Sequence, residues 1–150
     1  MEYLQPIGDL VIKLVTTEKE LEAAIAVRFR VFVAEQSIPA EEELDDEDAT
    51  ATHAIAFYGE EVVGTGRWVW RADGAAQIGR MAVDAQWRRK GVGGRILDFL
   101  EQSARSQGLA RSTLHAQDYV KGFYAAHGYR EHGESFFEVD IPHVEMRKAL

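Results

Sequence analysis

The residues with the clearest chemical character lie between positions 84 and 95, where basic side chains are followed by glycines. Although the chain has a formal net charge of -8, this stretch carries four cations: Arg88, Arg89, Lys90 and Arg95. A helix N-terminus already carries partial positive charge and favours acidic neighbours. A bound anion would explain the cations, because glycines let backbone N–H groups approach a phosphate closely. We therefore interpret residues 88–94 as a phosphate-binding loop; the alternative is a solvated basic loop.

The spacing of the glycines excludes two common nucleotide motifs. The chain contains no G-x-x-x-x-G-K-[ST] run, which a nucleoside triphosphate loop requires. A dinucleotide fingerprint, G-x-G-x-x-G, begins at Gly91 and Gly93 but has Ile96 in place of its third glycine. The stretch does match the pattern [QR]-x-x-G-x-[GA], with Arg88, Gly91 and Gly93 at the specified positions.

The elements on either side would hold this loop in place. Residues 77–83 have the short apolar character of a buried strand. After the loop, apolar residues recur at the helical period at Val92, Ile96, Phe99, Leu100 and Ala104. Gly108 then stands where a left-handed residue commonly ends a helix. The sequence thus predicts a strand, the phosphate-binding loop and a helix in succession.

The rest of the chain supplies further strands and two more helices. A capping box of Thr17 and Glu20 begins a helix that runs to about residue 33 or 35. The strands are expected at residues 10–15, 52–58, 61–70 and 111–117, with later extended pieces from 129, at 136–139 and at 144–147. A further helix is expected at 119–127, ended by Gly128. This succession predicts an α+β or mixed α/β fold in a single domain, residues 1–150.

The composition limits the classes of partner. The chain has no cysteine, and its five histidines show no metal-binding spacing, so we expect neither a disulfide nor a metal site. No apolar run approaches the length of a membrane span, which favours a cytoplasmic protein without a membrane partner. Residues 41–48 hold seven of the 25 acidic residues. We expect a surface loop or short helical turns there, mostly solvated or attracting a cationic amine, and no nucleic-acid partner.

The pattern [QR]-x-x-G-x-[GA] at a strand-to-helix turn resembles the acyl-coenzyme A site of the GNAT superfamily of N-acetyltransferases. Residues 123–129, F-Y-A-A-H-G-Y, resemble the F-Y-x-x-x-G-[FY] signature of that family, and the element order agrees over nearly the whole chain. Residues 27–36 and the ending at 141–144 are similar to the ElaA-like subgroup. The resemblance implies the GNAT-like acyl-CoA acyltransferase fold, a mostly antiparallel mixed sheet flanked by helices. It also implies an acetyl-CoA-dependent N-acetyltransferase.

The same resemblance implies which residues bind the cofactor. The strand before the loop would pair with the pantetheine arm, and the loop amides would bind the pyrophosphate. The residues in these roles would be Met81, Ala82, Val83, Arg88, Arg89, Lys90, Gly91, Val92, Gly93, Gly94, Gln117 and Tyr124. Members of the family often have an asparagine near the end of the fifth strand, where this chain has Gln117 or Asp118.

Acetyl transfer to an amine needs a neutral amine, a donor to the carbonyl oxygen and a proton for the departing thiolate. By resemblance, Tyr124 is the candidate general acid, although an aromatic residue on a short helix often serves packing alone. The N–H of Val83 or a neighbour would stabilise the developing oxyanion. The candidate bases are Glu35 at the end of the first helix, and His53 and His115 on strands; a strand histidine is usually a structural polar residue.

The acceptor would be a primary amine of a small molecule or a peptide. Two other functions stay open: a non-catalytic acyl-CoA-binding or interaction module on the same fold, and a different acyl acceptor, because Arg30-Val31-Phe32 also resembles autoinducer synthases. Exposed late strands would allow edge pairing in a homodimer.

Overall fold

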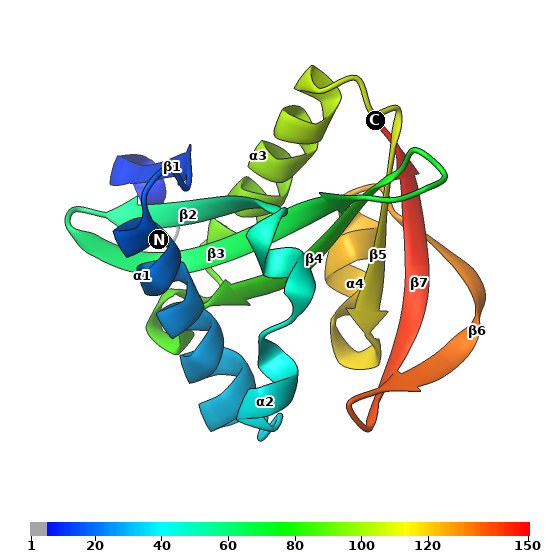
Figure 1. Ribbon diagram of the computed structural model, residues 1–150, viewed down its shortest axis with the longest axis horizontal. Helices are drawn as coiled ribbons and strands as arrows, with labels where there is room; N and C mark the ends of the chain where they lie inside the picture. Colours follow the sequence, from blue (N-terminus) through cyan, green and yellow to red (C-terminus); the bar gives the residue numbers. More distant parts are fainter. Residues whose placement is uncertain (1–5) are drawn as a thin grey trace.

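The computed structural model describes residues 6–150, and their strands form one mixed sheet (Figure 1). The strands are β1 (Leu10–Leu14), β2 (Thr52–Tyr58), β3 (Glu61–Trp70), β4 (Ala76–Val83), β5 (Arg111–Gln117), β6 (Arg130–Glu138) and β7 (Ile141–Ala149). Their order in the sheet is β1-β2-β3-β4-β5-β7-β6, and neighbours pair antiparallel except β4 and β5, which run parallel. The predicted mostly antiparallel mixed sheet is confirmed.

Helices cover both faces of this sheet. They are α1 (Glu18–Arg28), α2 (Ala40–Glu43), α3 (Val92–Ser106) and α4 (Lys121–Ala126). The long helix α3 and the short α4 lie on one face, and α1 and α2 lie on the other (Figure 1). The apolar stripe of α3, including Ile96 and Leu100, is fully buried against the sheet. In the part of the chain that the structure describes, no helix has the length and apolar character needed to cross a membrane.

Local sequence signals account for most element boundaries. The predicted limits of β2, β3 and β5 are confirmed, and α3 ends at Ser106, just before Gly108 with φ 90°. Thr17 caps α1, since its Oγ1 accepts a hydrogen bond from the N–H of Glu20. The reciprocal half of the capping box differs from expectation: the Glu20 carboxylate accepts from the N–H of Thr16, one residue earlier than the cap.

The first helix changes its winding where it approaches the centre of the sheet. Residues Phe29–Glu35 continue α1 as a π-helical segment, so the predicted extent is confirmed although the winding is wider. This segment buries Val31 and Phe32 against Ala82 of β4. π-helical turns are uncommon and occur frequently at functional sites. Here Glu35, the last residue of the segment, and Gln36, which follows it, lie at the edge of a cleft.

The cleft arises because β4 and β5 are paired over only part of their length. Their register ends at Ile78 with Leu114, after two preceding pairs. Arg80, two residues later on β4, has φ 51°, a conformation that bends a strand away from regular pairing. Beyond that point β4 and β5 diverge (Figure 1), and residues from both line the space between them. The parallel pair is therefore closed at one end and open at the other.

The acidic run at residues 41–48 is mostly exposed, as expected, but it also anchors the fold, which the sequence did not indicate. It forms α2 and a short 3-10 turn, Asp46–Ala49. Glu43 and its partner Arg28 of α1 are each 1% exposed in their side chains, with Nη2 and Oε1 2.7 Å apart. Arg28 also contacts Asp48 at 2.8 Å. Burying charges is costly unless they are paired and hydrogen-bonded, and here they are.

Strand arginines complete this network from the other side. Arg67 of β3 lies 2.6 Å from Asp48 and 2.9 Å from Asp45. Arg80 contacts Asp45 at 3.1 Å. Arg71 pairs with Glu47. Acidic residues that the sequence alone left without partners thus fasten α2 and the following turn to α1, β3 and β4.

This network predicts a specific loss of stability in acid. Burial alone would raise the pKa of Asp48, but hydrogen bonds and charge from Arg28 hold it well below the usual range. A carboxyl whose pKa is lower in the folded state stabilises the fold above its unfolded value, near 3.9, and loses that contribution as pH falls. Asp48→Asn should lower the free energy of unfolding at pH 6 by about 1–3 kcal/mol, and the loss should be smaller at pH 3, where part of the contribution has already gone because the pH lies between the unfolded and the folded pKa.

Urea unfolding at the two pH values measures this difference. Asp46→Asn is the matched control, because Asp46 lies in the same run and is exposed. Equal losses at pH 6 and pH 3 in Asp48→Asn would contradict an ionic role for the Asp48 carboxylate.

Candidate active site

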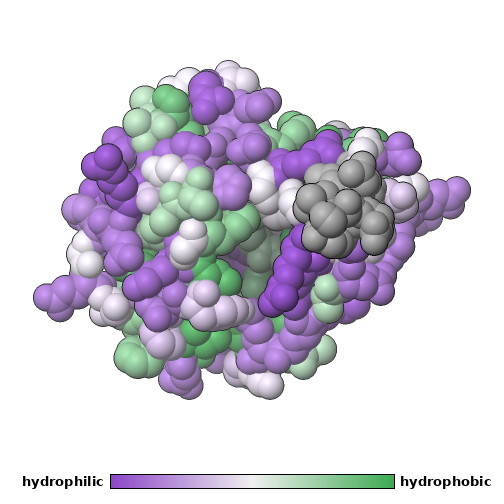
Figure 2. Space-filling model, turned by 180° about the vertical axis from the view of Figure 1, so that it is seen from behind, coloured by the Kyte–Doolittle hydropathy of each residue, from purple (hydrophilic) through white to green (hydrophobic). Residues whose placement is uncertain are grey.

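The cleft between the diverging ends of β4 and β5 has a volume of about 1420 Å³. Its wall includes the end of the π-helical segment, the acidic run, β4, the phosphate-binding loop, β5, α4 and the β6–β7 turn. On the face that carries α3 and α4, hydrophobic side chains gather at a hollow near the centre and hydrophilic ones surround it (Figure 2). The cleft brings together the sequence-predicted cofactor-binding residues, Glu35 and Tyr124, with the exception of Lys90, which is not among its lining residues.

The phosphate-binding loop leads directly into α3. Gly91 has φ 87°, a left-handed conformation that glycine adopts without strain, and no side chain caps the helix there. A Cβ added to Gly94 would lie 2.9 Å from Nε2 of His127, so the loop and α4 meet closely only because this residue is glycine. The first N–H groups of a helix have no partner inside it. In α3 those of the first turn belong to Val92, Gly93 and Gly94, which line the cleft.

Two of the four basic residues of this stretch are engaged by other parts of the protein. Arg88 donates from Nε to the carbonyl oxygen of Val83 at 2.8 Å and pairs with Glu35 at 2.7 Å. Arg95 is turned toward β1, where it donates to the carbonyl oxygen of Leu10. Arg89 lines the cleft. Fewer side chains than the four that the sequence suggested are therefore placed to contact an anion at the loop.

The F-Y-x-x-x-G-Y segment divides into cleft and core residues. Phe123 lies beside the loop, 3.5 Å from a Cβ placed on Gly93, and its ring meets that of Tyr124 edge to face at 5.0 Å. Tyr129 is 2% exposed, and its hydroxyl hydrogen-bonds Ser112 at 2.8 Å and Glu101 at 2.9 Å. Tyr129 is thus the packing residue of the segment, which leaves Tyr124 for the cleft.

Tyr124 is half-buried and lines the cleft. Burial raises the pKa of its phenol to about 12, so the hydroxyl keeps its proton throughout the neutral range. Within residues 6–150 no protein group is placed at hydrogen-bonding distance from this hydroxyl, in contrast to that of Tyr129. A protonated phenol facing a cleft can donate to an anion that forms there.

The peptide group of Val83 also faces the cleft. The N–H of Asp84 bonds the carbonyl oxygen of Val63 on β3. Successive residues of an extended strand direct their peptide groups to opposite edges, so the N–H of Val83 points away from β3 and toward β5. Its carbonyl oxygen, on the same edge, is the one that Arg88 holds.

The candidate bases have different surroundings. Glu35 lines the cleft but is engaged by Arg88. His53 is 7% exposed beneath the acidic run, where Nε2 lies 2.9 Å from the carbonyl oxygen of Asp48, and burial lowers its pKa. The structure therefore places His53 in the charge network and outside the cleft lining. His115 does line the cleft.

Gln117 bridges the two sides of the cleft mouth. Its side-chain amide donates to Oε1 of Gln36 at 3.0 Å, and Gln36 in turn donates to the hydroxyl of Tyr119 at 2.9 Å. Gln36 directly follows the π-helical segment, and Gln117 ends β5. The sequence did not indicate Gln36 as a site residue, because its partners lie more than 80 positions away.

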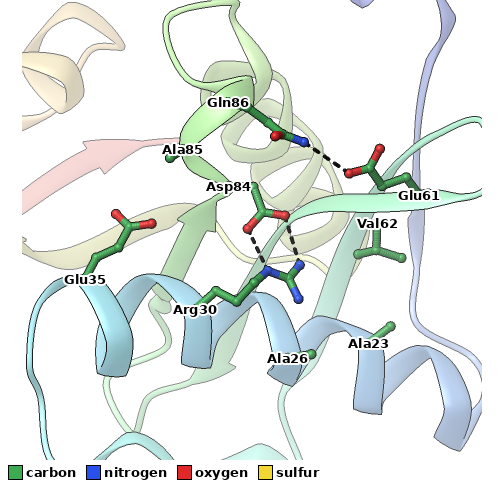
Figure 3. Close-up of a pocket in the computed structure, with 9 residues that line it drawn as sticks. All are labelled: Ala23, Ala26, Arg30, Glu35, Glu61, Val62, Asp84, Ala85 and Gln86. Atoms are coloured by element: carbon green, nitrogen blue, oxygen red, sulfur yellow. Dashed lines mark hydrogen bonds and ion pairs between the residues drawn. The ribbon is translucent and has the colours of Figure 1, made fainter.

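A smaller pocket of about 660 Å³ lies on the other side of the π-helical segment (Figure 3). Arg30 and Asp84 form a bidentate ion pair there, with both contacts at 2.9 Å, and Gln86 donates to Glu61 at 3.3 Å. The Arg30–Asp84 pair ties the first helix to the end of β4. The pocket has no phosphate-binding loop, so we treat the larger cleft as the active-site candidate.

Two further residues of the cleft escaped sequence reasoning. Glu138 ends β6 and His143 lies on β7, and both line the cleft beside His115. The available signal was the short spacing across a hairpin turn, which places residues close together on neighbouring strands. Their position next to β5 depends on the strand order, which places β7 between β5 and β6.

Comparisons with known proteins match residues 15–150 to the acetyltransferase (GNAT) domain. The uncharacterised N-acetyltransferase YjcF of Bacillus subtilis is 41% identical over 132 residues, or 87% of this chain and 94% of that protein. The crystal structure of an acyl-CoA N-acyltransferase from Pseudomonas aeruginosa covers 94% of this chain and 99% of its own, with 30% identity and a TM-score of 0.82. Escherichia coli ElaA has a TM-score of 0.82 at 23% identity over 93% and 99%, which shows a shared fold.

Proposed function

Because the chain belongs to the GNAT family of acetyltransferases, we propose that it moves an acetyl group from acetyl-coenzyme A to a primary amine of a small molecule or a peptide. The amine attacks the thioester directly, and Tyr124 protonates the departing thiolate. Acetyl-coenzyme A supplies the activated acetyl group. The observation that supports this proposal most strongly is the cleft between two diverging parallel strands, onto which the glycines at the start of α3 open.

The residues of the cleft suit an acyl-coenzyme A. The N–H groups of Gly93 and Gly94, with the charge of Arg89, would hold the pyrophosphate. The free edge of β4, from Met81 to Val83, would hold the pantetheine arm. A side chain on Gly94 would fill the approach to α4, so the local geometry supports this use of the loop.

The chemistry assigned to Tyr124 agrees with its environment. Desolvation that raises the pKa of the phenol acts on any anion in the same place, so the departing thiolate also becomes more basic. The two shifts offset each other, so burial does not disfavour the transfer of the proton from the phenol to the thiolate. The N–H of Val83 would stabilise the negative charge that develops on the carbonyl oxygen.

Binding to the loop is tested by thermal melting with acetyl-coenzyme A, coenzyme A, NAD and ATP. A ligand at 100 times its dissociation constant stabilises a protein by about 2.7 kcal/mol. We expect a shift with the two coenzyme A forms and its loss in Gly93→Asp, which places a carboxylate where the pyrophosphate would bind. Gly93 has room for a Cβ at ordinary contact distance, so the variant should fold.

Arg130→Glu is the control, because it reverses a charge on exposed β6 away from the loop. A coenzyme A shift that survives Gly93→Asp would contradict the assigned binding mode. Stabilisation by coenzyme A together with no turnover of any primary amine would favour the non-catalytic acyl-CoA-binding module.

A further inference from the structure

A histidine and a carboxylate meet at the wall of the cleft that β5 and the β6–β7 turn form. His115 is one residue beyond Leu114, the last residue of β5 that pairs with β4. Its Nδ1 lies 2.7 Å from Oε2 of Glu138, the last residue of β6. The two side chains are 34% and 45% exposed, so both can be reached from the cleft.

This contact determines which ring nitrogen of His115 carries the proton. An ionised carboxylate only accepts hydrogen bonds, so Nδ1–H donates to Glu138. In the neutral ring Nε2 then has a lone pair, and no hydrogen-bond partner for it is found among residues 6–150. A carboxylate on one nitrogen with the other nitrogen open is the arrangement that orients a histidine to accept a proton.

Neighbouring rings hold this pair in position. Phe136 of β6 meets the His115 ring edge to face at 5.0 Å and stacks on His143 at 6.1 Å. His143 donates from Nδ1 to the carbonyl oxygen of Ile141, and its Nε2 lies 3.8 Å from Oε1 of Glu138. Within the described part of the chain no group of histidines and carboxylates has the arrangement of a metal site. The Glu138 carboxylate therefore lies close to both imidazole rings, those of His115 and His143.

The turn beside Glu138 is strained. Val139 and Asp140 connect β6 to β7 with φ 44° and 63°, a two-residue hairpin turn in which both residues are left-handed. A β-branched residue in this region is a marked outlier. Backbone strain of this kind persists where the surrounding structure imposes it, and it concentrates at functional sites. Here the strained turn sets the position of the Glu138 side chain.

His115 and Tyr124 approach the cleft from opposite faces of the sheet. Leu114 and Ala116, which flank His115 on β5, are buried in the core that α3 covers. Because side chains alternate along a strand, His115 points to the other face. Tyr124 packs against the core on the α3 and α4 face. A reaction centre between the strands would thus meet a phenol on one side and an imidazole on the other.

We propose that His115 is the catalytic base that takes a proton from the acceptor ammonium and that Glu138 is the positioning residue that orients its ring. The inference rests on the proposed function and narrows the acceptor to alkyl amines that are protonated at neutral pH, as a lysine side chain is. These amines enter from the face that carries α1 and the acidic run.

The steps balance as follows. The ammonium gives one proton to Nε2 of His115, and the neutral amine then forms the C–N bond at the acetyl carbon. The C–S bond breaks, the sulfur takes a proton from Tyr124, and the second nitrogen proton returns through solvent to the phenolate. His115 releases its proton to water. The products are the N-acetylated amine and coenzyme A.

The charges around His115 give its pH dependence. The hydrogen bond to Glu138 raises the pKa of His115, and burial lowers it. The charge of Glu145 on β7 also raises this pKa, and the charge of Arg71 after β3 lowers it. His143 also lies close to the Glu138 carboxylate. A base must be neutral to act, so kcat/KM should rise as pH increases through the pKa of His115. Removing the Glu138 charge should move that rise to lower pH.

The test compares ethylamine with 2,2,2-trifluoroethylamine, which has the same skeleton but is largely unprotonated at neutral pH. Each is assayed with acetyl-coenzyme A by release of free thiol. His115→Ala should lower kcat/KM for ethylamine at pH 7 by about a hundredfold and change that for trifluoroethylamine little. Glu138→Gln should shift the pH profile downward, and an NMR titration of the ring nitrogens should show the pKa of His115 falling in this variant.

His132→Ala, an exposed histidine on the same strand as Glu138, should match the wild type. Unchanged ethylamine turnover in His115→Ala, equal losses with both amines, or a His115 pKa unaffected by Glu138→Gln would each overturn the inference while leaving the proposed function in place. A wild-type protein that acetylates neither probe nor any other amine, although acetyl-coenzyme A raises its melting temperature, would instead remove the proposed function and the inference with it.

Discussion

Tyr124→Phe should lower kcat by about a hundredfold or more while acetyl-coenzyme A still raises the melting temperature as in the wild type. General acid catalysis by a positioned side chain contributes roughly 10²- to 10⁴-fold. The substitution removes the donor and keeps the ring, which packs edge to face on Phe123 and on Tyr129. The loss should therefore appear in kcat, with little change in the KM for acetyl-coenzyme A.

Tyr58→Phe is the matched control, because Tyr58 packs on Trp87 away from the cleft lining and also loses a phenol hydroxyl. If kcat in Tyr124→Phe stays within a few-fold of the wild type, water or another group protonates the thiolate and Tyr124 has no acid role.

Arg28→Met should destabilise the fold by about 3–5 kcal/mol, the cost of breaking a buried ion pair by removing one partner. The guanidinium is held between Glu43 and Asp48, and its side chain is 1% exposed. Without it, the Glu43 carboxylate is left in a buried site with Arg80 as its remaining close cation. Urea unfolding at pH 7 measures the change.

Arg30→Met provides a control on the same helical stretch. Arg30 makes an ion pair of comparable geometry with Asp84, but its side chain is 51% exposed. Exposed pairs contribute about 0–1 kcal/mol, so the two variants should differ several-fold in their effect. Similar losses for Arg28→Met and Arg30→Met would mean that burial does not set the strength of these pairs. Adding Glu43→Leu to Arg28→Met should recover part of the loss, since the uncompensated charge is removed.

The sequence predicted those elements whose signals are local. The limits of β2, β3 and β5 followed from apolar runs bounded by turns, and the cap of α1 followed from Thr17 and Glu20. The π-helical winding was not predictable, because an apolar stripe such as that of Val31 and Phe32 has nearly the same spacing in either winding. The ion pairs of the acidic run were not predictable for a different reason. Its arginine partners come from α1, β3 and β4, and only the folded chain brings them to the same place.

The candidate site shows the same difference between residues with local sequence signals and residues that only the folded chain brings together. The phosphate-binding loop and Tyr124 lie in short contiguous motifs, so their place at the cleft could be anticipated from the family pattern. The sequence alone could not select one of the three candidate catalytic bases. His53 lies in the charge network, Glu35 is bound by Arg88, and His115 gains Glu138 from a strand 23 positions away. Such pairs depend on strand order, which a single sequence specifies only weakly.

The divergence of β4 from β5 leaves a strand edge inside the sheet. At the margin of a sheet, an unpaired edge can pair with strands of other proteins and so promotes aggregation. Here β5 and β7 lie beyond the opening, so another protein's strand has no approach in the plane of the sheet. A narrow extended molecule with amide groups can still enter and pair with Val83 and its neighbours, in the manner of strand addition. The opening in the sheet thus excludes wide molecules before any side chain discriminates among ligands.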